Sequence, residues 1–279
     1  MRISYLGPAG TFTEDALRDA LGDAEAELLP EPTVYDAIEA VAEGRADRAL
    51  VPFENSLEGA VRATLDALAF EIPSMTIVGE HDQRISQALI AGRELPLTEI
   101  TAVLSHPQAS AQCARYIREQ LPNAEVRGVA STAEAVREVV ESDQPWAALG
   151  AHGAAGIYGG VVLADGVEDS EDNVTRFVWI GRPDVRPTGE GPWRTTLIFA
   201  ELGEDRPGAL VDALVVFSSR GVNLTRIESR PRRSGLGQYM FFVDLEGSTD
   251  DPTVAEAIEA LREVAESVRI LGSYPVGAG

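Results

Sequence analysis

Short apolar runs alternate with amphipathic segments through the first part of the chain, and this alternation predicts a repeated strand–helix unit. The first run, residues 3–6, precedes Gly7-Pro8-Ala9-Gly10, which predicts a tight turn into a helix that Thr11 can cap. Such alternation indicates a largely parallel sheet covered by helices on both faces, with ligands at the carboxyl ends of the strands. Further strands are expected at 48–52, 75–79, 88–91, 100–105, 126–129, 146–149 and 161–164, and further helices after 33, at 107–121 and at 132–141.

A segment rich in proline and glycine, residues 182–192, interrupts this periodicity and marks a domain boundary. A smaller unit follows. Its β-α-β-β-α-β order is that of a ferredoxin-like fold, which by itself says nothing about function. The expected elements are strand 195–202, helix 207–219, strands 222–230 and 238–245, helix 251–266 and strand 268–274.

The composition fits a globular chain of roughly two domains, because 279 residues with 44% hydrophobic content can bury sizeable cores. No apolar stretch approaches the roughly 20 residues that span a bilayer, and the chain starts as a strand and turn instead of a signal peptide. We therefore expect a cytoplasmic protein with no membrane partner. The single cysteine, Cys113, excludes an intrachain disulfide, and the three histidines lie far apart in sequence, so no metal site is expected.

The formal net charge of −22 argues against a nucleic-acid partner and against anionic membrane surfaces, since long-range repulsion opposes both contacts. The chain contains no lysine, which a GC-rich genome or a high-salt cytoplasm would explain. The absence of lysine excludes Schiff-base chemistry and a phosphate loop that uses this residue. An anionic ligand must therefore be held by arginine, by helix N-termini or by neutral donors.

Polar residues follow two of the predicted strands directly, where open α/β sheets carry their sites. Glu54, Asn55 and Ser56 follow the strand 48–52. The alternative is that Asn55 or Ser56 only caps the next helix.

Ser105-His106-Pro107-Gln108 repeats this arrangement at the end of the strand 100–105. Ser105 can serve as an N-cap, and Gln108 and Gln112 lie four apart on one helical face. Glutamines in such positions are often only solvated. Here the opposite face already carries the apolar residues, so the glutamine face is free to line a cleft.

Thr175, Arg176 and Phe177 open a strand just after the acidic run 168–172. A hydroxyl donor beside a fixed cation suits a reaction in which a leaving oxygen is hydrogen-bonded while a carboxylate is held still. Alone the motif is weak, because threonine and phenylalanine often open ordinary strands and an arginine there is often solvated or paired with nearby acids.

Six motifs occur in a fixed order along nearly the whole chain. They are Gly7-Pro8-x-Gly10-Thr11-Phe12-Thr13, Pro52-x-Glu54-Asn55-Ser56-x-x-Gly59, Ser105-His106-Pro107-Gln108-Ala109-x-x-Gln112-Cys113, Thr175-Arg176-Phe177, Gly208-Ala209-Leu210-Val211 and Asn223-Leu224-Thr225-x-Ile227-Glu228-Ser229-Arg230-Pro231. The first four resemble the motifs of the prephenate dehydratases at comparable spacing. The last two look like the signatures of the ACT domain that binds phenylalanine in this family. The combination is specific, although each motif alone would be weak.

The resemblance implies an α/β fold in which a two-lobed catalytic domain, like that of periplasmic binding proteins, precedes a ferredoxin-like ACT domain. The implied site lies in the cleft between the lobes. The implied division is a catalytic domain at 1–182, with one lobe at about 1–75 plus 165–181 and the other at 76–164, a linker at 183–194 and the ACT domain at 195–275.

Prephenate dehydratases convert prephenate to phenylpyruvate with loss of carbon dioxide and water in phenylalanine biosynthesis, and the resemblance implies the same lyase activity here, without a metal or an organic cofactor. It also implies that Thr175 faces the leaving hydroxyl, with Glu54 as a second proton source. The family often carries a histidine where this chain has residues 85–88, so no role is assigned there. The implied substrate-binding residues are Thr11, Asn55, Ser56, Ser105, Gln108, Gln112, Arg176 and Phe177.

The resemblance further implies allosteric regulation by L-phenylalanine, bound at a pocket between ACT domains of a homodimer or homotetramer. Two alternatives stay open: an arogenate dehydratase, which acts on the amino analogue of prephenate, and a non-catalytic amino-acid-binding regulator. The implied effector-binding residues are Gly208, Ala209, Leu210, Val211, Asn223, Leu224, Glu228 and Ser229.

Overall fold

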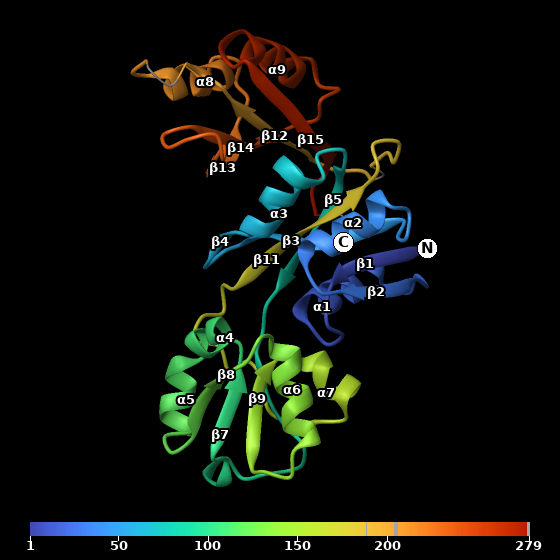
Figure 1. Ribbon diagram of the computed structural model, residues 1–279, viewed down its shortest axis with the longest axis vertical. Coiled ribbons are helices and arrows are strands. Elements are labelled where there is room, and N and C mark those ends of the chain that lie inside the picture. Colours follow the sequence, from blue (N-terminus) through green and yellow to red (C-terminus); the bar gives the residue numbers. More distant parts are fainter. Residues whose placement is uncertain (188, 204–205, 278–279) are drawn as a thin grey trace.

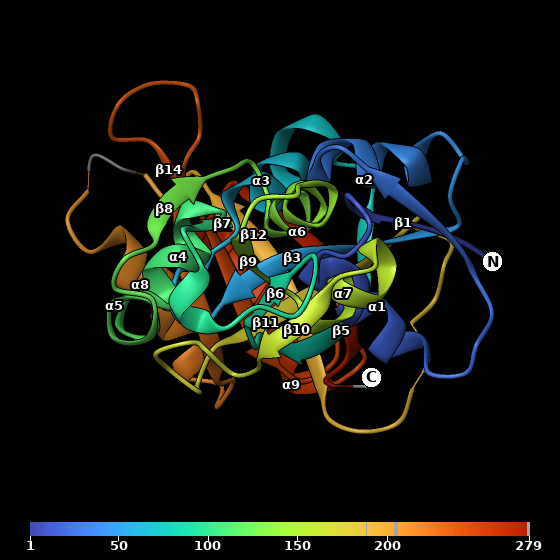
Figure 2. The ribbon, with the colours of Figure 1, turned by 90° about the horizontal axis from the view of Figure 1, so that it is seen from below.

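The computed structural model describes residues 1–187, 189–203 and 206–277. Three sheets follow one another along the long axis of the molecule, with the C-terminal unit at one end, a first lobe in the middle and a second lobe at the other end (Figure 1). Figure 2 looks along this axis from the second lobe, which lies in front of the other two units.

The first lobe is a mixed sheet in the order β2-β1-β3-β11-β5, with β4 paired to β3. β1 runs parallel to β2 and β3, whereas β11 runs antiparallel to β3 and β5. The expectation of a largely parallel sheet is therefore wrong in this lobe. The elements are β1 (Arg2–Leu6), α1 (Phe12–Leu21), β2 (Glu27–Glu31), α2 (Val34–Ala42), β3 (Arg48–Asn55), β4 (Gly59–Ala60), α3 (Arg62–Asp66), a π-helical turn (Ala67–Glu71), β5 (Thr76–Arg84) and β11 (Val174–Gly181).

The chain leaves the first lobe later than expected. β5 pairs along its length with β11, so residues up to Arg84 belong to the first lobe, and the expected division at residue 75 is corrected to a crossing after Arg84. A second crossing returns the chain to β11, after residue 165. The two crossing segments are tied together, because the amide of Ile85 donates to the carbonyl of Asn173 at 2.8 Å and the amide of Val167 donates to Gln87 at 3.0 Å.

The second lobe is a sheet in the order β10-β6-β9-β7-β8, covered by α6 and α7 on one face and by α4 and α5 on the other. The helix expected at 107–121 is interrupted at Cys113, whose backbone leaves the helical region. The elements are β6 (Ala88–Ala91), a 3₁₀ turn (Leu97–Glu99), β7 (Ala102–Ser105), α4 (Pro107–Gln112), α5 (Ala114–Gln120), β8 (Glu125–Gly128), α6 (Thr132–Glu141), β9 (Trp146–Gly150), α7 (His152–Tyr158) and β10 (Val161–Ala164).

The C-terminal unit is a four-stranded antiparallel sheet in the order β13-β14-β12-β15, with α8 and α9 packed on one face. This arrangement confirms the ferredoxin-like prediction. No helix in the described part of the chain is long and apolar enough to cross a membrane. The elements are β12 (Trp193–Ala200), α8 (Ala209–Ser218), β13 (Leu224–Pro231), β14 (Tyr239–Glu246), α9 (Pro252–Val264) and β15 (Ser267–Pro275).

The helix-free face of the C-terminal sheet shares a hydrophobic core with the first lobe. Phe242 and Tyr274 are fully buried in one cluster with Val51 and Phe53 of β3. Backbones meet closely at Gly272, where a Cβ atom would lie 2.1 Å from the carbonyl oxygen of Ile77. Only glycine fits this contact. The proline-rich segment after β11 therefore joins two units that are packed together, instead of separating two independent bodies.

The single thiol provides a test of the second lobe's packing. Burial raises the pKa of the Cys113 thiol to about 12, because desolvation disfavours the thiolate. At pH 8 about one thiol in 10⁴ would be ionised, so we expect a thiol-specific reagent to leave the native protein unlabelled and to label one site in denaturant. The measurement is absorbance or mass shift under both conditions. Rapid labelling of the native protein would contradict this packing.

Candidate active site

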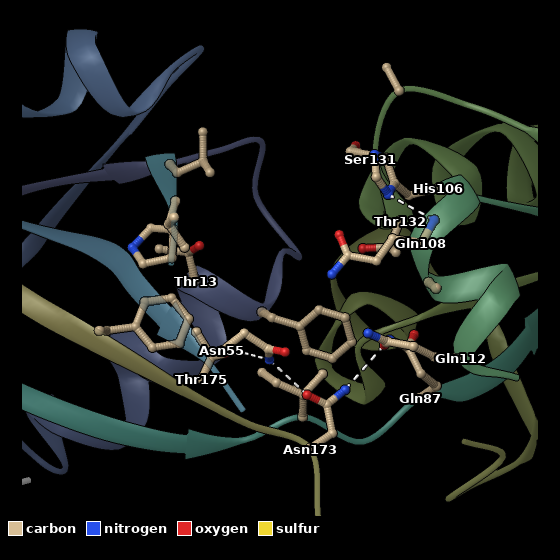
Figure 3. Close-up of a pocket in the computed structure, with 18 residues that line it drawn as sticks. Thr13, Asn55, Gln87, His106, Gln108, Gln112, Ser131, Thr132, Asn173 and Thr175 are labelled. Carbon is tan, nitrogen blue, oxygen red and sulfur yellow. Dashed lines mark hydrogen bonds between the residues drawn. The ribbon is translucent and has the colours of Figure 1, made fainter. Parts of the chain in front are cut away.

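A pocket of about 310 Å³ lies between the two lobes, where the crossing segments join them (Figure 3). Its lining comes from the starts of α1, α4, α6 and β11, from the end of β3 and from the two crossing segments. Asn55, Thr175 and Asn173 lie opposite Gln108 and Gln112. The lining residues are Leu6, Phe12, Thr13, Pro52, Asn55, Val61, Ile85, Gln87, His106, Gln108, Ala109, Gln112, Ala130, Ser131, Thr132, Asn173, Thr175 and Phe177.

The side chains of β11 point alternately into the pocket and away from it. Successive side chains of a strand point to opposite faces, so Thr175 and Phe177 enter the pocket while Arg176 points away from it. Arg176 is buried instead against Glu54 and Asp244, at 2.8 and 2.6 Å. The prediction that Arg176 binds substrate is therefore wrong. The two-residue period of a strand already places Arg176 on the face opposite to that of Thr175.

The orientation of Asn55 is fixed by the turn that follows β3. Its Oδ1 accepts hydrogen bonds from the amides of Leu57 and Glu58 at 2.9 and 3.0 Å, so its Nδ2 must face the other way. There Nδ2 donates to Asn173 Oδ1 at 2.7 Å and to Thr175 Oγ1 at 2.9 Å. The oxygen of Thr175 is thus an acceptor for Asn55, and its hydroxyl hydrogen remains available to a ligand.

The hydrogen-bond network of Asn55 extends to the second lobe. Because Asn173 accepts through Oδ1, its Nδ2 is free to donate, and it does so to Gln112 Oε1 at 3.1 Å. The amide hydrogens of Gln112 are then left for the pocket. A directed chain of amides therefore runs from the turn after β3 across the crossing segment into α4, and presents donors to the cavity.

The backbone gives this pocket a positive potential. None of its lining residues is Asp, Glu or Arg. The ten-residue helices α1 and α6 both begin at this cavity, and the first amides of a helix carry partial positive charge and lack intrahelical partners. The hydroxyls of Thr13, Ser131 and Thr132 lie beside these helix starts. The site can therefore bind an anion without a charged side chain.

Five expected site residues lie outside this pocket lining, and each has a structural role. The hydroxyl of Thr11 caps α1, accepting from Glu14 and donating to Leu6. That of Ser105 is buried and donates to the carbonyl of Leu149, and His106 is the actual N-cap of α4. The other three residues are Ser56, which bonds to the backbone of Asp172 and Val174, and Glu54 and Arg176, which pair with each other.

The alternative that Asn55 or Ser56 caps the next helix is also wrong. α3 starts at Arg62, with Val61 at its N-cap and no side-chain cap bond. Of the residues expected in the site, Asn55, Gln108, Gln112, Thr175 and Phe177 line the pocket.

Sequence reasoning missed several polar pocket residues. Thr13 and Thr132 lie in the first turns of capped helices and Ser131 is the N-cap of α6, so the capping pattern was a usable signal for them. Gln87 lies on the first crossing segment, is 2% exposed, and its Oε1 has no hydrogen-bond partner among the described residues. No local pattern marked Gln87 or Asn173, because their position depends on how the two crossings meet. The polar lining residues to which the sequence analysis assigned no role are Thr13, Gln87, His106, Ser131, Thr132 and Asn173, of which Thr13 and His106 lie within the quoted motifs.

Most of the expected effector residues lie at the two ends of α8. Gly208 is the left-handed N-cap of α8, and Ala209, Leu210 and Val211 form its first turn. Asn223 and Leu224 lie beyond the other end of this ten-residue helix, about 15 Å away.

The remaining two expected effector residues lie on opposite faces of β13. Glu228 shares the face of Arg226 and Arg230, toward the first lobe, and so points away from α8. Ser229, the next residue, is exposed on the opposite face. A single chain therefore does not bring the expected effector residues together.

Two α/β lobes enclose a pocket, and a ferredoxin-like unit packs on the first lobe through a shared core. This is the architecture of a two-lobed ligand-binding protein with an appended domain. The comparisons with known proteins agree with it. The family model for prephenate dehydratase matches residues 3–185, and the model for the ACT domain matches residues 185–263. The chain belongs to the prephenate dehydratase family.

Individual relatives match over nearly the whole chain. A prephenate dehydratase of Mycobacterium tuberculosis is 39% identical over 285 residues, which span 99% of this chain and 88% of the relative. The solved prephenate dehydratase of Arthrobacter aurescens, in complex with L-Phe, is 42% identical with a TM-score of 0.91, covering 99% of this chain and 90% of that one. GqqA, described as a novel type of quorum quenching acylase, is 32% identical with a TM-score of 0.88, covering 99% and 98%.

The amide chain predicts a stability effect that does not depend on any activity. Asn55→Asp replaces the Nδ2 donor by a carboxylate oxygen that faces Asn173 Oδ1, so this donated bond becomes a contact between two acceptors, whereas the Thr175 hydroxyl can turn to donate to the new carboxylate. We expect the free energy of unfolding in urea to fall by about 1–3 kcal/mol. Asn123→Asp, the same change at an exposed turn, is the control and should have almost no effect. Equal effects of the two variants would contradict the network.

Proposed function

We propose that this protein converts prephenate to phenylpyruvate, with loss of carbon dioxide and water, as a carbon–oxygen lyase in L-phenylalanine biosynthesis. The observation that carries the proposal is the Thr175 hydroxyl. Asn55 donates to its oxygen, so its hydrogen is free to donate to a ligand in a pocket that otherwise offers neutral donors. Membership of the family supports the same reaction.

The protein itself does little covalent chemistry in this reaction. The bond between the ring and its carboxylate carbon breaks, its electron pair enters the ring, and the C4–oxygen bond breaks on the far side; the departing oxygen takes up a proton and leaves as water. A hydrogen bond from Thr175 to that oxygen strengthens as charge develops on it, which lowers the barrier. Glu54 does not line the pocket and is paired with Arg176, so the hydroxyl of Thr175 is the group we assign to the leaving oxygen.

Prephenate carries two carboxylates, and the pocket offers two kinds of anion partner. The first turns of α1 and α6 supply backbone amides at the positive ends of helix dipoles. Gln108 and Gln112 supply side-chain amide donors from the facing lobe. Holding a substrate from both lobes orients it for the elimination, which is the larger part of the catalysis needed here.

The lining favours prephenate over arogenate. Arogenate carries an ammonium group, which binding sites usually pair with a carboxylate, and none of the pocket residues is acidic. The acylase activity described for GqqA finds no support in this pocket, because among the described residues no pocket hydroxyl is hydrogen-bonded to a histidine that would activate it as a nucleophile. A non-catalytic regulator would bind prephenate without releasing phenylpyruvate, which a turnover assay decides.

We also propose that L-phenylalanine regulates the enzyme through the C-terminal unit of a homodimer or homotetramer. The start of α8 and the start of β13 are too far apart within one chain to hold one amino acid together, but two copies can bring one of each together. Exposed apolar side chains flank both elements: Val211 and Val215 on α8 are 60% and 51% exposed, and Ile227 on edge strand β13 is 46% exposed. Such a patch suits a second copy of the chain. The L-Phe complex of the Arthrobacter aurescens relative supports the same effector.

Replacing the hydroxyl tests the catalytic assignment. We expect Thr175→Ala to lower kcat for phenylpyruvate formation by roughly 10²- to 10⁴-fold, and Thr175→Ser to lower it less, because the contact is made to a charge that develops in the transition state. Thr101→Ala, at an exposed threonine of the second lobe, is the control. Wild-type kcat in Thr175→Ala would exclude the assignment, and a wild-type protein without turnover would exclude the function.

Two glycines with the same backbone strain separate effector binding from folding. Gly208 and Gly44 have φ of +86° and +75°, and neither would bring a Cβ atom within 4 Å of a neighbour, so alanine costs similar strain at both. We expect Gly208→Ala to weaken L-phenylalanine binding by calorimetry and Gly44→Ala to leave it unchanged. Equal weakening would show that strain, and not contact at Gly208, is responsible.

A further inference from the structure

A cluster of buried charges lies behind the active-site strands, on the face of the first lobe that the C-terminal sheet covers. Arg176 is at its centre and reaches both Glu54 and Asp244, with Glu80 at 3.5 Å. Asp244 comes from β14 and its side chain is fully buried. The C-terminal unit therefore contributes a charge that touches the strand carrying Thr175.

The strand segments that hold this cluster carry the pocket residues on their other face. In the pairing of β11 with β3, Thr175 is opposite Asn55 and Arg176 is opposite Glu54. The next pair joins Phe177 to Pro52, so Phe53 is an extra, unpaired residue and β3 has a bulge here. A bulge re-aims the side chains beside it and is often found next to an active site.

The bulge explains a break in alternation on β3. Phe53 and Glu54 are consecutive, yet both face the charge cluster, while Pro52 and Asn55 both face the pocket. Without the bulge, Asn55 would not oppose Thr175 with its amide aimed into the cavity. The position of the catalytic end of β3 therefore depends on this irregular geometry.

The cluster packs directly against the bulge. The guanidinium groups of Arg176 and Arg226 lie 5.0 and 4.8 Å from the ring centre of Phe53, and Arg226 also approaches Glu54 at 3.4 Å. Two further interactions fix Asp244 and keep its partner charged. Its Oδ1 accepts from Thr196 at 2.8 Å, which holds Oδ2 toward Arg176. Burial acts to lower the pKa of Arg176, but Asp244 and the neighbouring groups raise it above its ordinary value, so the guanidinium stays charged.

We infer that Asp244 is a positioning residue for the reaction: through Arg176 it fixes the bulge that aims Asn55 and Thr175 at the substrate. The inference rests on the proposed function. A displacement of about 1 Å at a catalytic group can cost about 10²-fold in rate, so we expect Asp244→Asn to lower kcat by about 10- to 100-fold. KM should change little, because Asp244 lies outside the pocket lining.

A second ion pair between the same two units provides the control. Asp66 of α3 pairs with Arg230 of β13 through two hydrogen bonds of 2.7 Å, away from the bulge and outside the pocket lining. Asp66→Asn weakens the contact between the units without touching β3 or β11. We expect its kcat to stay within about twofold of wild type. Both variants are assayed well below their thermal midpoints, so that loss of folded protein does not enter kcat.

A double-mutant cycle distinguishes positioning from a general structural role. In a Thr175→Ala background, assayed at high enzyme concentration, the hydroxyl that Asp244 would position is gone, so Asp244→Asn should cost much less than it does in wild type. If the factors by which the two single substitutions lower kcat simply multiply in the double variant, the inference is overturned. Equal kcat for Asp244→Asn and Asp66→Asn would overturn it as well. Absence of turnover in the wild-type protein would instead overturn the proposed function.

Discussion

The antiparallel insertion of β11 between β3 and β5 is the constraint on which the rest of the molecule depends. The strand is where the chain returns from the second lobe. It joins β3 to the edge strand β5 and sets where the crossing segments lie. Its two faces serve two different neighbours, the pocket and the C-terminal sheet. A change in the pairing of β11 would therefore affect both the pocket and the contact with the C-terminal sheet.

The pocket reconciles a strongly acidic chain with an anionic ligand. With a net charge of −22, the surface repels anions at long range, and screening by salt reduces this only beyond about 10 Å. Inside the pocket there is no acidic side chain, and the helix starts and amide chain supply local positive potential. The arginines closest to the catalytic strands are occupied with carboxylates instead. On the proposed function, selectivity would come from directed neutral donors, which also avoid the desolvation cost of a buried cation.

Much of the architecture could be predicted from sequence, because strand and helix periods, capping residues and the proline-rich boundary are local signals. The errors have physical causes. β2 was missed because Pro30 and two glutamates obscure its strand pattern, which an edge position tolerates. Arg176 was assigned to the pocket although the strand period places its side chain on the other face of β11 from that of Thr175. The bulge at Phe53, the placement of Gln87 and Asn173 in one pocket, and the pairing of Asp244 with Arg176 depend on segments far apart in sequence, so no local pattern indicates them.

The separation of Gly208 and Asn223 by the length of α8 has a consequence for how the protein would behave in a cell. A sensor whose two halves belong to different chains exists only in the assembled state, so its affinity for the effector is linked to the association of subunits by mass action. Feedback would then fade on dilution even when the amino acid is abundant. By the same linkage, the effector would draw subunits together, and the cellular level of the protein would itself set how sharply its pathway responds.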